Sequence, residues 1–222
     1  MRTLAVLPVK SFTAAKGRLA ARLEPAERAA LAEAMLGDVL EALLEAEELE
    51  GVAVVTAEPR AAAVGVEAGA AVIADPEQAG QSPAAALGIA DALRAGCERV
   101  LLVPGDTPLL SSDDVDKLLR RSADAGTGVA IVPDRHGTGT NALLLSPPDA
   151  IAPGFGPDSC ARHLAAAETA TVAHAVERVT SLAHDVDTPE DLSALAARLR
   201  EADPAVARRT RTTAALSLPT GV

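Results

Sequence analysis

The chain has 222 residues, of which 49% are hydrophobic, 23% charged and 1% aromatic, a composition that favours one folded domain with an aliphatic core. The formal net charge of −11 repels phosphate backbones, and the chain has few aromatic side chains on which bases could stack. No nucleic-acid partner is therefore expected. No apolar stretch approaches the roughly 20 residues that a membrane span requires, so we expect a cytoplasmic protein without a membrane partner.

Apolar runs alternate with segments of helical periodicity through the first half of the chain. The run Thr3–Val9 predicts a strand buried on both faces, because it is short and continuous. Leu31, Met35 and Val39 recur at helical spacing and predict a helix from Glu24-Pro25 to about Glu48. Further strands are predicted at Gly51–Thr56, Ala70–Ala74 and Arg99–Pro104, and further helices at Pro59–Ala68 and Ala84–Ala95.

The second half continues the alternation. Helices are predicted from about Ser112, from Ser159 and over Pro189–Glu201, with strands at Thr127–Pro133 and Asn141–Leu145 and a β-like stretch over Thr171–Val186. This order predicts an α/β fold with a mostly parallel sheet and helices on both faces. Residues 1–201 are expected to form a single domain, and residues 202–222 a flexible C-terminal tail.

A basic loop follows the first predicted strand. Ligands of such sheets bind at the carboxyl ends of the strands, so Lys10, Lys16 and Arg18 are candidate catalytic residues. Their fixed cations could neutralise a triphosphate and the pyrophosphate that leaves it. The alternative is a solvated basic loop without a ligand.

Carboxylates follow two other predicted elements. Asp106 stands at a strand end, where it could hold Mg²⁺ between a nucleotide and an acceptor, or only cap the next helix. Asp185 and Asp187 are one residue apart and would face the same side of an extended chain, so they could share a metal with a third carboxylate. Asp185 is assigned to the metal, Asp187 is a further candidate, and Thr188 is predicted to cap the last helix.

Two glycine-rich segments, Gly137–Asn141 and Gly154–Ser159, could converge their backbone N–H groups on an anion. A helix beginning at Ser159 would add its positive end, which suits a small phosphorylated acid. The alternative is two ordinary surface turns. His163, beside Arg162, is a weaker candidate for the acceptor site.

Five motifs in one order carry a family resemblance. The segments LPVKSFTAAKGRL, VPGDTPLL, GTGTNALL, FGPDSCARH and DVDTPEDL resemble the guanylyltransferases that activate 2-phospho-L-lactate or phosphoenolpyruvate in biosynthesis of coenzyme F-420, over roughly residues 1–200. The resemblance implies a Rossmann-like nucleotidyltransferase fold of the glycosyltransferase-A type, GTP as donor, Mg²⁺ and release of pyrophosphate. It also implies a downstream deazaflavin transferase as partner.

The same resemblance assigns residues to roles. Asp106 and Asp185 would hold the metal, and the phospho-acid would be bound by Thr140, Gly156 and Ser159. The segment Gly80–Pro83 departs from the Leu-Asn pair that the family has near the base and ribose. Two other functions stay open: another nucleotidyltransferase acting on a sugar phosphate or cofactor, and a non-catalytic nucleotide-binding protein of the same fold. The acceptor is phosphoenolpyruvate or 2-phospho-L-lactate.

Overall fold

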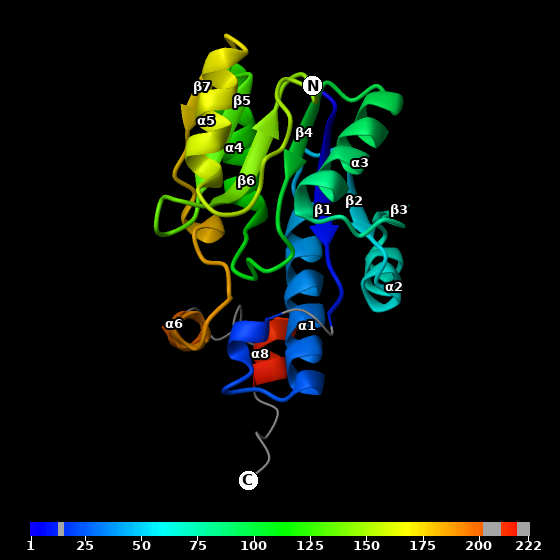
Figure 1. Cartoon of the computed structure of the whole chain (residues 1–222), viewed down its shortest axis with the longest axis vertical. Helices are drawn as coiled ribbons and strands as arrows, with labels where there is room; N and C mark the ends of the chain where they lie inside the picture. The colour runs from blue at the N-terminus through cyan, green and yellow to red at the C-terminus, as the bar shows by residue number, and fades with distance from the viewer. Residues whose placement is uncertain (13–15, 202–209, 217–222) are drawn as a thin grey trace.

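A seven-stranded sheet forms the centre of the computed structural model, which describes residues 1–12, 16–201 and 210–216 (Figure 1). The strand order is β3-β2-β1-β4-β6-β5-β7. β6 runs antiparallel to β4 and β5, while the other neighbouring pairs are parallel, so the prediction of a mostly parallel sheet is confirmed. The strands are β1 (Thr3–Val9), β2 (Gly51–Thr56), β3 (Ala71–Ala74), β4 (Arg99–Leu102), β5 (Val129–Pro133), β6 (Thr140–Leu145) and β7 (His174–Val176).

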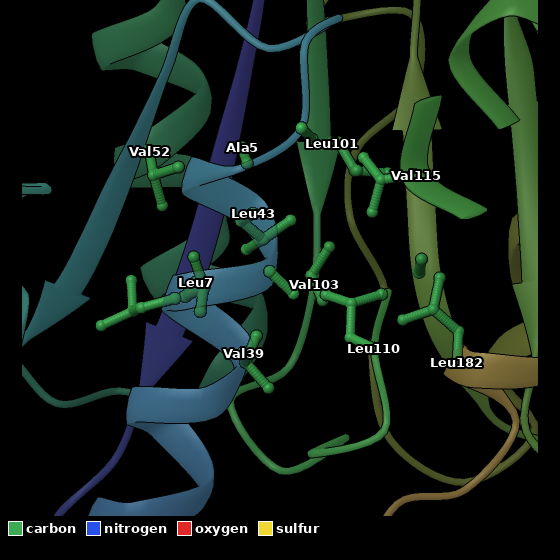
Figure 2. Packing of buried hydrophobic residues seen from close by; sticks show 14 of the residues in the cluster. Ala5, Leu7, Val39, Leu43, Val52, Leu101, Val103, Leu110, Val115 and Leu182 are labelled. Carbon is green, nitrogen blue, oxygen red and sulfur yellow. The ribbon is translucent and has the colours of Figure 1, made fainter. Parts of the chain in front are cut away.

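Helices cover both faces of this sheet, as predicted. One hydrophobic cluster packs α1, α2 and α4 on one face, and a second packs α3 and α5 on the other. Figure 2 shows part of the first cluster, with Leu7 of β1 beside Val39 and Leu43 of α1. The helices are α1 (Pro25–Leu44), α2 (Pro59–Ala68), α3 (Gln81–Arg94), α4 (Ser112–Asp124), α5 (Ser159–Thr169), α6 (Pro189–Glu201) and α8 (Arg211–Leu216), with short 3-10 turns η1 (Gly17–Leu19) and η2 (Thr180–Leu182).

The central strand β1 divides its side chains between the two clusters. Ala5 and Leu7 face α1, whereas Val6 faces α3, because successive side chains of a strand point to opposite faces. The backbone of α3 approaches β1 so closely that a Cβ at Gly88 would lie 2.2 Å from the Val6 Cγ1 atom. A glycine therefore sets the distance between α3 and the sheet.

A β-bulge interrupts the pairing of β5 and β6. Val132 pairs with Ala142 and Pro133 with Thr140, so Asn141 is an extra residue on β6. Thr140 consequently contacts α5, while Asn141 reaches the opposite face, where its Nδ2 donates to the Leu182 carbonyl at 2.8 Å. A bulge of this kind redirects side chains without ending the strand.

Several boundaries differ from the sequence prediction. α1 ends at Leu44, not near Glu48, because the backbone N–H groups of Glu47 and Glu48 donate to the Asp116 carboxylate of α4. α3 begins three residues earlier than predicted, after Gly80 at φ 123°, and Pro83 is accommodated in its first turn. The predicted β-like stretch from residue 171 to residue 186 contains the short strand β7 and the turn η2.

Residues 211–216, within the segment for which the sequence predicts a flexible tail, form helix α8. Helix α8 packs on α1, and the Asp38 carboxylate accepts hydrogen bonds from the backbone N–H groups of Arg211 and Thr212 at 2.7 and 2.9 Å. The other parts of the predicted tail, residues 202–209 and 217–222, lie outside the described residues. Within the described part of the chain, no helix is both long and apolar enough to cross a membrane.

Candidate active site

A cavity of about 350 Å³ opens at the carboxyl ends of β1 and β4. The residues after these strands enter it because parallel strands deliver their following loops to one edge of the sheet. Lys10, Lys16, Asp106 and Asp187, all predicted from the sequence as site residues, line it. The other lining residues are Pro8, Val9, Phe12, Ala32, Met35, Leu36, Gln81, Pro104 and Gly105.

Lys16 bridges two carboxylates in this cavity. Its Nζ atom lies 2.5 Å from Asp106 Oδ2 and 2.9 Å from Asp187 Oδ1, and its side chain is only 6% exposed. Burial alone would lower the pKa of Lys16, but the charges and hydrogen bonds of the two aspartates outweigh it and raise the pKa above the ordinary 10.5. Lys16 therefore brings a full positive charge into the cavity at neutral pH.

Asp185 lies beside the same cluster. The backbone N–H of the next residue, Val186, donates to the Asp106 carbonyl at 3.2 Å. Burial and the nearby charges of Asp106 and Asp187 raise the pKa of Asp185 above the ordinary 3.8, although a hydrogen bond from Asn141 Nδ2 to Oδ1 at 3.3 Å opposes the rise. Asp106 and Asp185, 79 positions apart in the sequence, are thus neighbours in space.

The carboxylate cluster fits a divalent cation that keeps part of its own shell. Asp106 Oδ1 is buried and has no hydrogen-bond partner among the described residues, so this carboxylate oxygen is available as a ligand for a hard cation. Among the described residues, no three histidine, cysteine or acidic side chains are gathered into a ready-made metal cage. Mg²⁺ requires no such cage, because it usually takes one or two carboxylates and completes its shell with phosphates and water.

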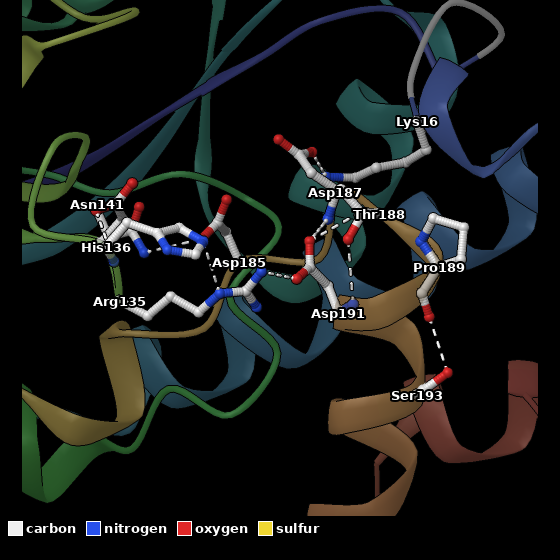
Figure 3. Close-up of polar contacts among 11 residues, drawn as sticks. Lys16, Arg135, His136, Asn141, Asp185, Asp187, Thr188, Pro189, Asp191 and Ser193 are labelled. Carbon is white, nitrogen blue, oxygen red and sulfur yellow. Dashed lines mark hydrogen bonds and ion pairs between the residues drawn. The ribbon is translucent and has the colours of Figure 1, made fainter.

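The segment that carries Asp185 and Asp187 is held by the start of α6. Asp191 Oδ2 accepts hydrogen bonds from the backbone N–H groups of Asp187 and Thr188 at 3.0 and 2.8 Å, and Thr188 Oγ1 accepts one from the Asp191 N–H at 3.3 Å. Figure 3 shows this reciprocal cap, together with the ion pair between Arg135 and Asp191. The predicted capping role of Thr188 is confirmed, and the cap orients Asp187 toward Lys16.

The predicted acceptor residues lie on β6 and at the start of α5. Thr140 Oγ1 is 3.0 Å from His163 Nδ1, Ser159 is 1% exposed in the first turn of α5, and Gly156 adopts φ 115°. The loop before α5 reaches the start of α3, where the Phe155 N–H donates to Ser82 Oγ at 2.9 Å. None of the predicted acceptor residues, all of which the structure describes, lines this cavity. They connect to it through Ser82, which follows the lining residue Gln81, and through Asn141, which bonds Asp185 beside Asp106.

Two of the predicted basic residues are exposed to solvent. Arg18 lies exposed on η1, a position open to solvent, and Lys10 is exposed at the cavity edge. Asn141 was part of a recognised motif, yet its contact with Asp185 was not foreseen. The sequence feature that marks Asn141 is its position as a polar residue directly before the apolar run of a buried strand. Gln81 falls in the segment that departs from the family pattern, and it lines the cavity.

Comparison with known proteins identifies relatives over nearly the whole chain. The family model described as "Guanylyl transferase CofC like" matches residues 3–199. A phosphoenolpyruvate guanylyltransferase from Conexibacter woesei is 51% identical over 88% of this chain and 87% of its own length. One from Sphaerobacter thermophilus is 42% identical over 88% and 93%. A 3-phospho-D-glycerate guanylyltransferase from Phenylobacterium zucineum is 40% identical over 84% and 86%.

Solved structures agree on the fold. A CMP:2-keto-3-deoxy-manno-octonic acid synthetase complexed with CTP has a TM-score of 0.62 at 15% identity, covering 90% of this chain and 99% of its own. A 4-diphosphocytidyl-2C-methyl-D-erythritol synthase has a TM-score of 0.61 at 15% identity, covering 87% and 97%. The nucleotidyltransferase fold expected from the five motifs is confirmed. By the match of the family model and the identity to its relatives, the chain belongs to the CofC-like guanylyl transferase family.

Proposed function

We propose that this chain transfers GMP from GTP to phosphoenolpyruvate and releases pyrophosphate, as a step toward coenzyme F-420. The names of the relatives at 51% and 42% identity support phosphoenolpyruvate as the acceptor. The observation that carries the proposal is the cavity in which Lys16 faces Asp106 and Asp187 at the carboxyl edge of the sheet. Such a site combines a fixed cation for phosphate with carboxylates for a metal.

Asp106 and Asp185 would hold Mg²⁺, with Asp187, which is paired with Lys16, as a further candidate. When bound, Mg²⁺ would supply positive charge to the phosphate oxygens of the donor. The unpartnered Asp106 Oδ1 and the raised pKa of Asp185, caused by burial and by its acidic neighbours, both suit a group that gains a cation on substrate binding.

The reaction joins two anions. A phosphate oxygen of phosphoenolpyruvate attacks the α-phosphorus of GTP, and the bond from that phosphorus to the oxygen of the departing pyrophosphate breaks in line. The acceptor phosphate is already ionised at neutral pH, so no protein group has to remove a proton. Lys10 and Lys16, which line the cavity, screen the negative charge, and positioning supplies much of the acceleration.

The acceptor acid would lie between the carboxylate cluster and the start of α5. Thr140 offers a side-chain hydroxyl, and Gly156 and Ser159 lie at the positive end of a helix of 11 residues, where the Ser159 N–H itself donates to the Gly156 carbonyl at 3.2 Å. These groups suit the phosphate and carboxylate of a three-carbon acid. A cytoplasmic location and delivery of the product to a deazaflavin transferase stay predictions.

The test is a matrix of donors and acceptors. The purified protein is incubated with Mg²⁺, each of GTP, ATP, CTP and UTP, and each of phosphoenolpyruvate, 2-phospho-L-lactate and 3-phospho-D-glycerate. Pyrophosphate release gives the rate, and mass spectrometry identifies the conjugate. GTP with phosphoenolpyruvate is expected to have the highest kcat/KM. A higher value with another acid would replace the acceptor, and GTP binding without pyrophosphate release in any mixture would favour a non-catalytic binding protein.

A further inference from the structure

His163 of α5 uses both ring nitrogens inside the protein. Its residue is 1% exposed, Nε2 lies 2.9 Å from the backbone nitrogen of Gly154, and Nδ1 lies 3.0 Å from Thr140 Oγ1. The ring of Phe155 packs edge-on against it, with centroids 5.3 Å apart. The imidazole thus joins the bulged strand β6 to the loop before α5, two segments that carry predicted acceptor residues.

The hydrogen bond from Gly154 decides where the imidazole proton lies. A backbone N–H can only donate, so Nε2 must accept and carries no proton. A neutral imidazole holds one N–H, which is therefore on Nδ1 and donates to Thr140 Oγ1. Burial and the charge of Arg162 lower the pKa of His163 to about 4, so the ring is neutral at physiological pH.

With the proton on His163 Nδ1, the O–H of the Thr140 hydroxyl remains available as a hydrogen-bond donor. Its oxygen accepts from His163, and among the described residues no other protein atom is hydrogen-bonded to that hydroxyl. The bulge turns Thr140 toward α5, while the adjacent Asn141 bonds Asp185 on the other face, so Thr140 directly precedes in sequence the residue that contacts the carboxylates. A hydroxyl whose hydrogen is free to be donated is suited to binding an anion.

The loop that faces Thr140 is held by the same helix. Besides the His163 contact at Gly154 N, the guanidinium of Arg162 donates to the Gly154 carbonyl at 2.5 Å and to the Pro157 carbonyl at 2.7 Å. Arg162 and His163, which are adjacent on α5, thereby hold the glycine-rich loop in position. His163 therefore contacts both Thr140 and the loop that follows residue 153.

We propose that His163 is a positioning residue that, through its Nδ1–H, commits the Thr140 hydroxyl to donate a hydrogen bond to the phosphorylated acid. The inference rests on the proposed function, because it takes Thr140 to face the acceptor. His163 itself touches neither substrate. Its effect should consequently appear in the KM for the acid and not in the KM for GTP.

Two substitutions test the coupling. His163→Gln keeps an acceptor near the Nε2 position for Gly154 but loses the donor to Thr140, and it should raise the KM for phosphoenolpyruvate about tenfold with the KM for GTP within about twofold. In a Thr140→Val background, where the hydroxyl is gone, the same change should add less than about twofold. Thr140→Ser restores a hydroxyl and should recover most of the loss seen in Thr140→Val. The exposed His174→Gln is the matched control.

A measurement on the unsubstituted protein stands apart from activity. Nitrogen-15 NMR of the histidine rings at pH 7 should show His163 protonated at Nδ1 alone. A ring protonated at Nε2, equal effects of His163→Gln with and without Thr140, or equal rises of both KM values would each overturn the inference. If the unsubstituted protein released no pyrophosphate with any of the three acids, the proposed function would fail, and the NMR result would still decide the proton position.

Discussion

Asp106 pairs with Lys16 in the cavity, and it is the carboxylate to which the proposed mechanism assigns the metal. In Asp106→Asn the side chain keeps its shape but loses the charge that pairs with Lys16 and would bind Mg²⁺. We expect turnover to fall at least about a hundredfold at saturating Mg²⁺, with an unchanged circular dichroism spectrum. Asp113→Asn, an exposed change in the first turn of α4, is the control. A nearly normal rate in Asp106→Asn would remove Asp106 from the mechanism.

The ionised form of Asp185 lowers the stability of the folded protein. Burial and its neighbours raise its pKa in the folded protein, so its ionised form is disfavoured by folding and the unfolded chain binds fewer protons at that group. The contribution of Asp185 to stability is full below the unfolded pKa and is lost as pH rises through the folded pKa. Asp185→Asn should therefore raise the Tm of the metal-free protein at pH 7 while lowering activity.

The pH series gives the check on that sign. The gain in Tm of Asp185→Asn over the unsubstituted protein should shrink as the pH is lowered through the raised pKa, because Asp185 is then protonated and as neutral as asparagine. A gain that is constant from pH 7 to pH 3, or a loss at pH 7, would contradict the assignment. Asp187→Asn, which removes a partner of Lys16, is a useful comparison on the same segment.

At the scale of elements, the contact of α3 with β1 depends on one missing side chain. Alanine favours helices over glycine by up to about 1 kcal/mol, yet a Cβ at position 88 would lie 2.2 Å from Val6 Cγ1. We expect Gly88→Ala to destabilise the protein by about 1–3 kcal/mol in urea unfolding, since the clash outweighs the helical gain.

A second substitution distinguishes the clash from a general effect of the helix. Val6→Ala removes both Cγ atoms near the new methyl group, so it should cost less stability in the Gly88→Ala background than on its own. Gly51→Ala, whose added Cβ would meet Leu4 Cδ1 at an ordinary 3.7 Å, is a control outside this contact. Additive losses for Val6→Ala and Gly88→Ala would contradict the explanation.

Elements bounded by local signals were predictable, and those bounded by distant contacts were not. The strand Gly51–Thr56 and the helices Pro59–Ala68 and Pro189–Glu201 match the prediction, because proline or glycine marks their starts. The end of α1 depends on a contact with Asp116, which is 68 residues from Glu48. The local hydrophobic periodicity around Glu48 does not indicate this contact.

The candidate site residues likewise divide into those marked by local sequence motifs and those positioned by distant contacts. Motifs at strand ends placed Lys16, Asp106 and Asp187 correctly around one cavity, because parallel topology collects such loops at one edge. The contacts of Asn141 and His163 depend on a bulge in the β5–β6 register, which is set by the pairing partner and not by the residues themselves. Neither contact could be derived from spacing.

Helix α8, the last described segment of the chain, is attached to the helix that lines the cavity. Asp38 of α1 is 8% exposed and accepts from two N–H groups of α8, while Met35 and Leu36 of the same helix line the cavity. We expect Asp38→Ala to release α8 and cost about 1 kcal/mol of stability, because helix caps of this type contribute that much.

Hydrogen exchange gives the direct measurement. In Asp38→Ala the amide hydrogens of Arg211 and Thr212 should exchange at least about tenfold faster, while those of β1 and β4 keep their protection. Glu41→Ala, which removes a solvent-exposed partner of Arg211, should change these rates much less. Unchanged protection at Thr212 in Asp38→Ala would show that packing on α1 is enough to hold α8.

The bridge from Lys16 to Asp187 spans 171 residues, and the bond from Asp38 to Thr212 spans 174. During synthesis on a ribosome, Lys16 emerges long before either of its carboxylate partners. A nascent chain that has completed β1 and α1 contains neither Asp106 nor Asp187, and an arrest of translation before residue 187 leaves a product without that ion pair. A ligand that needs this pair could therefore assist folding only after residue 187 has been synthesised.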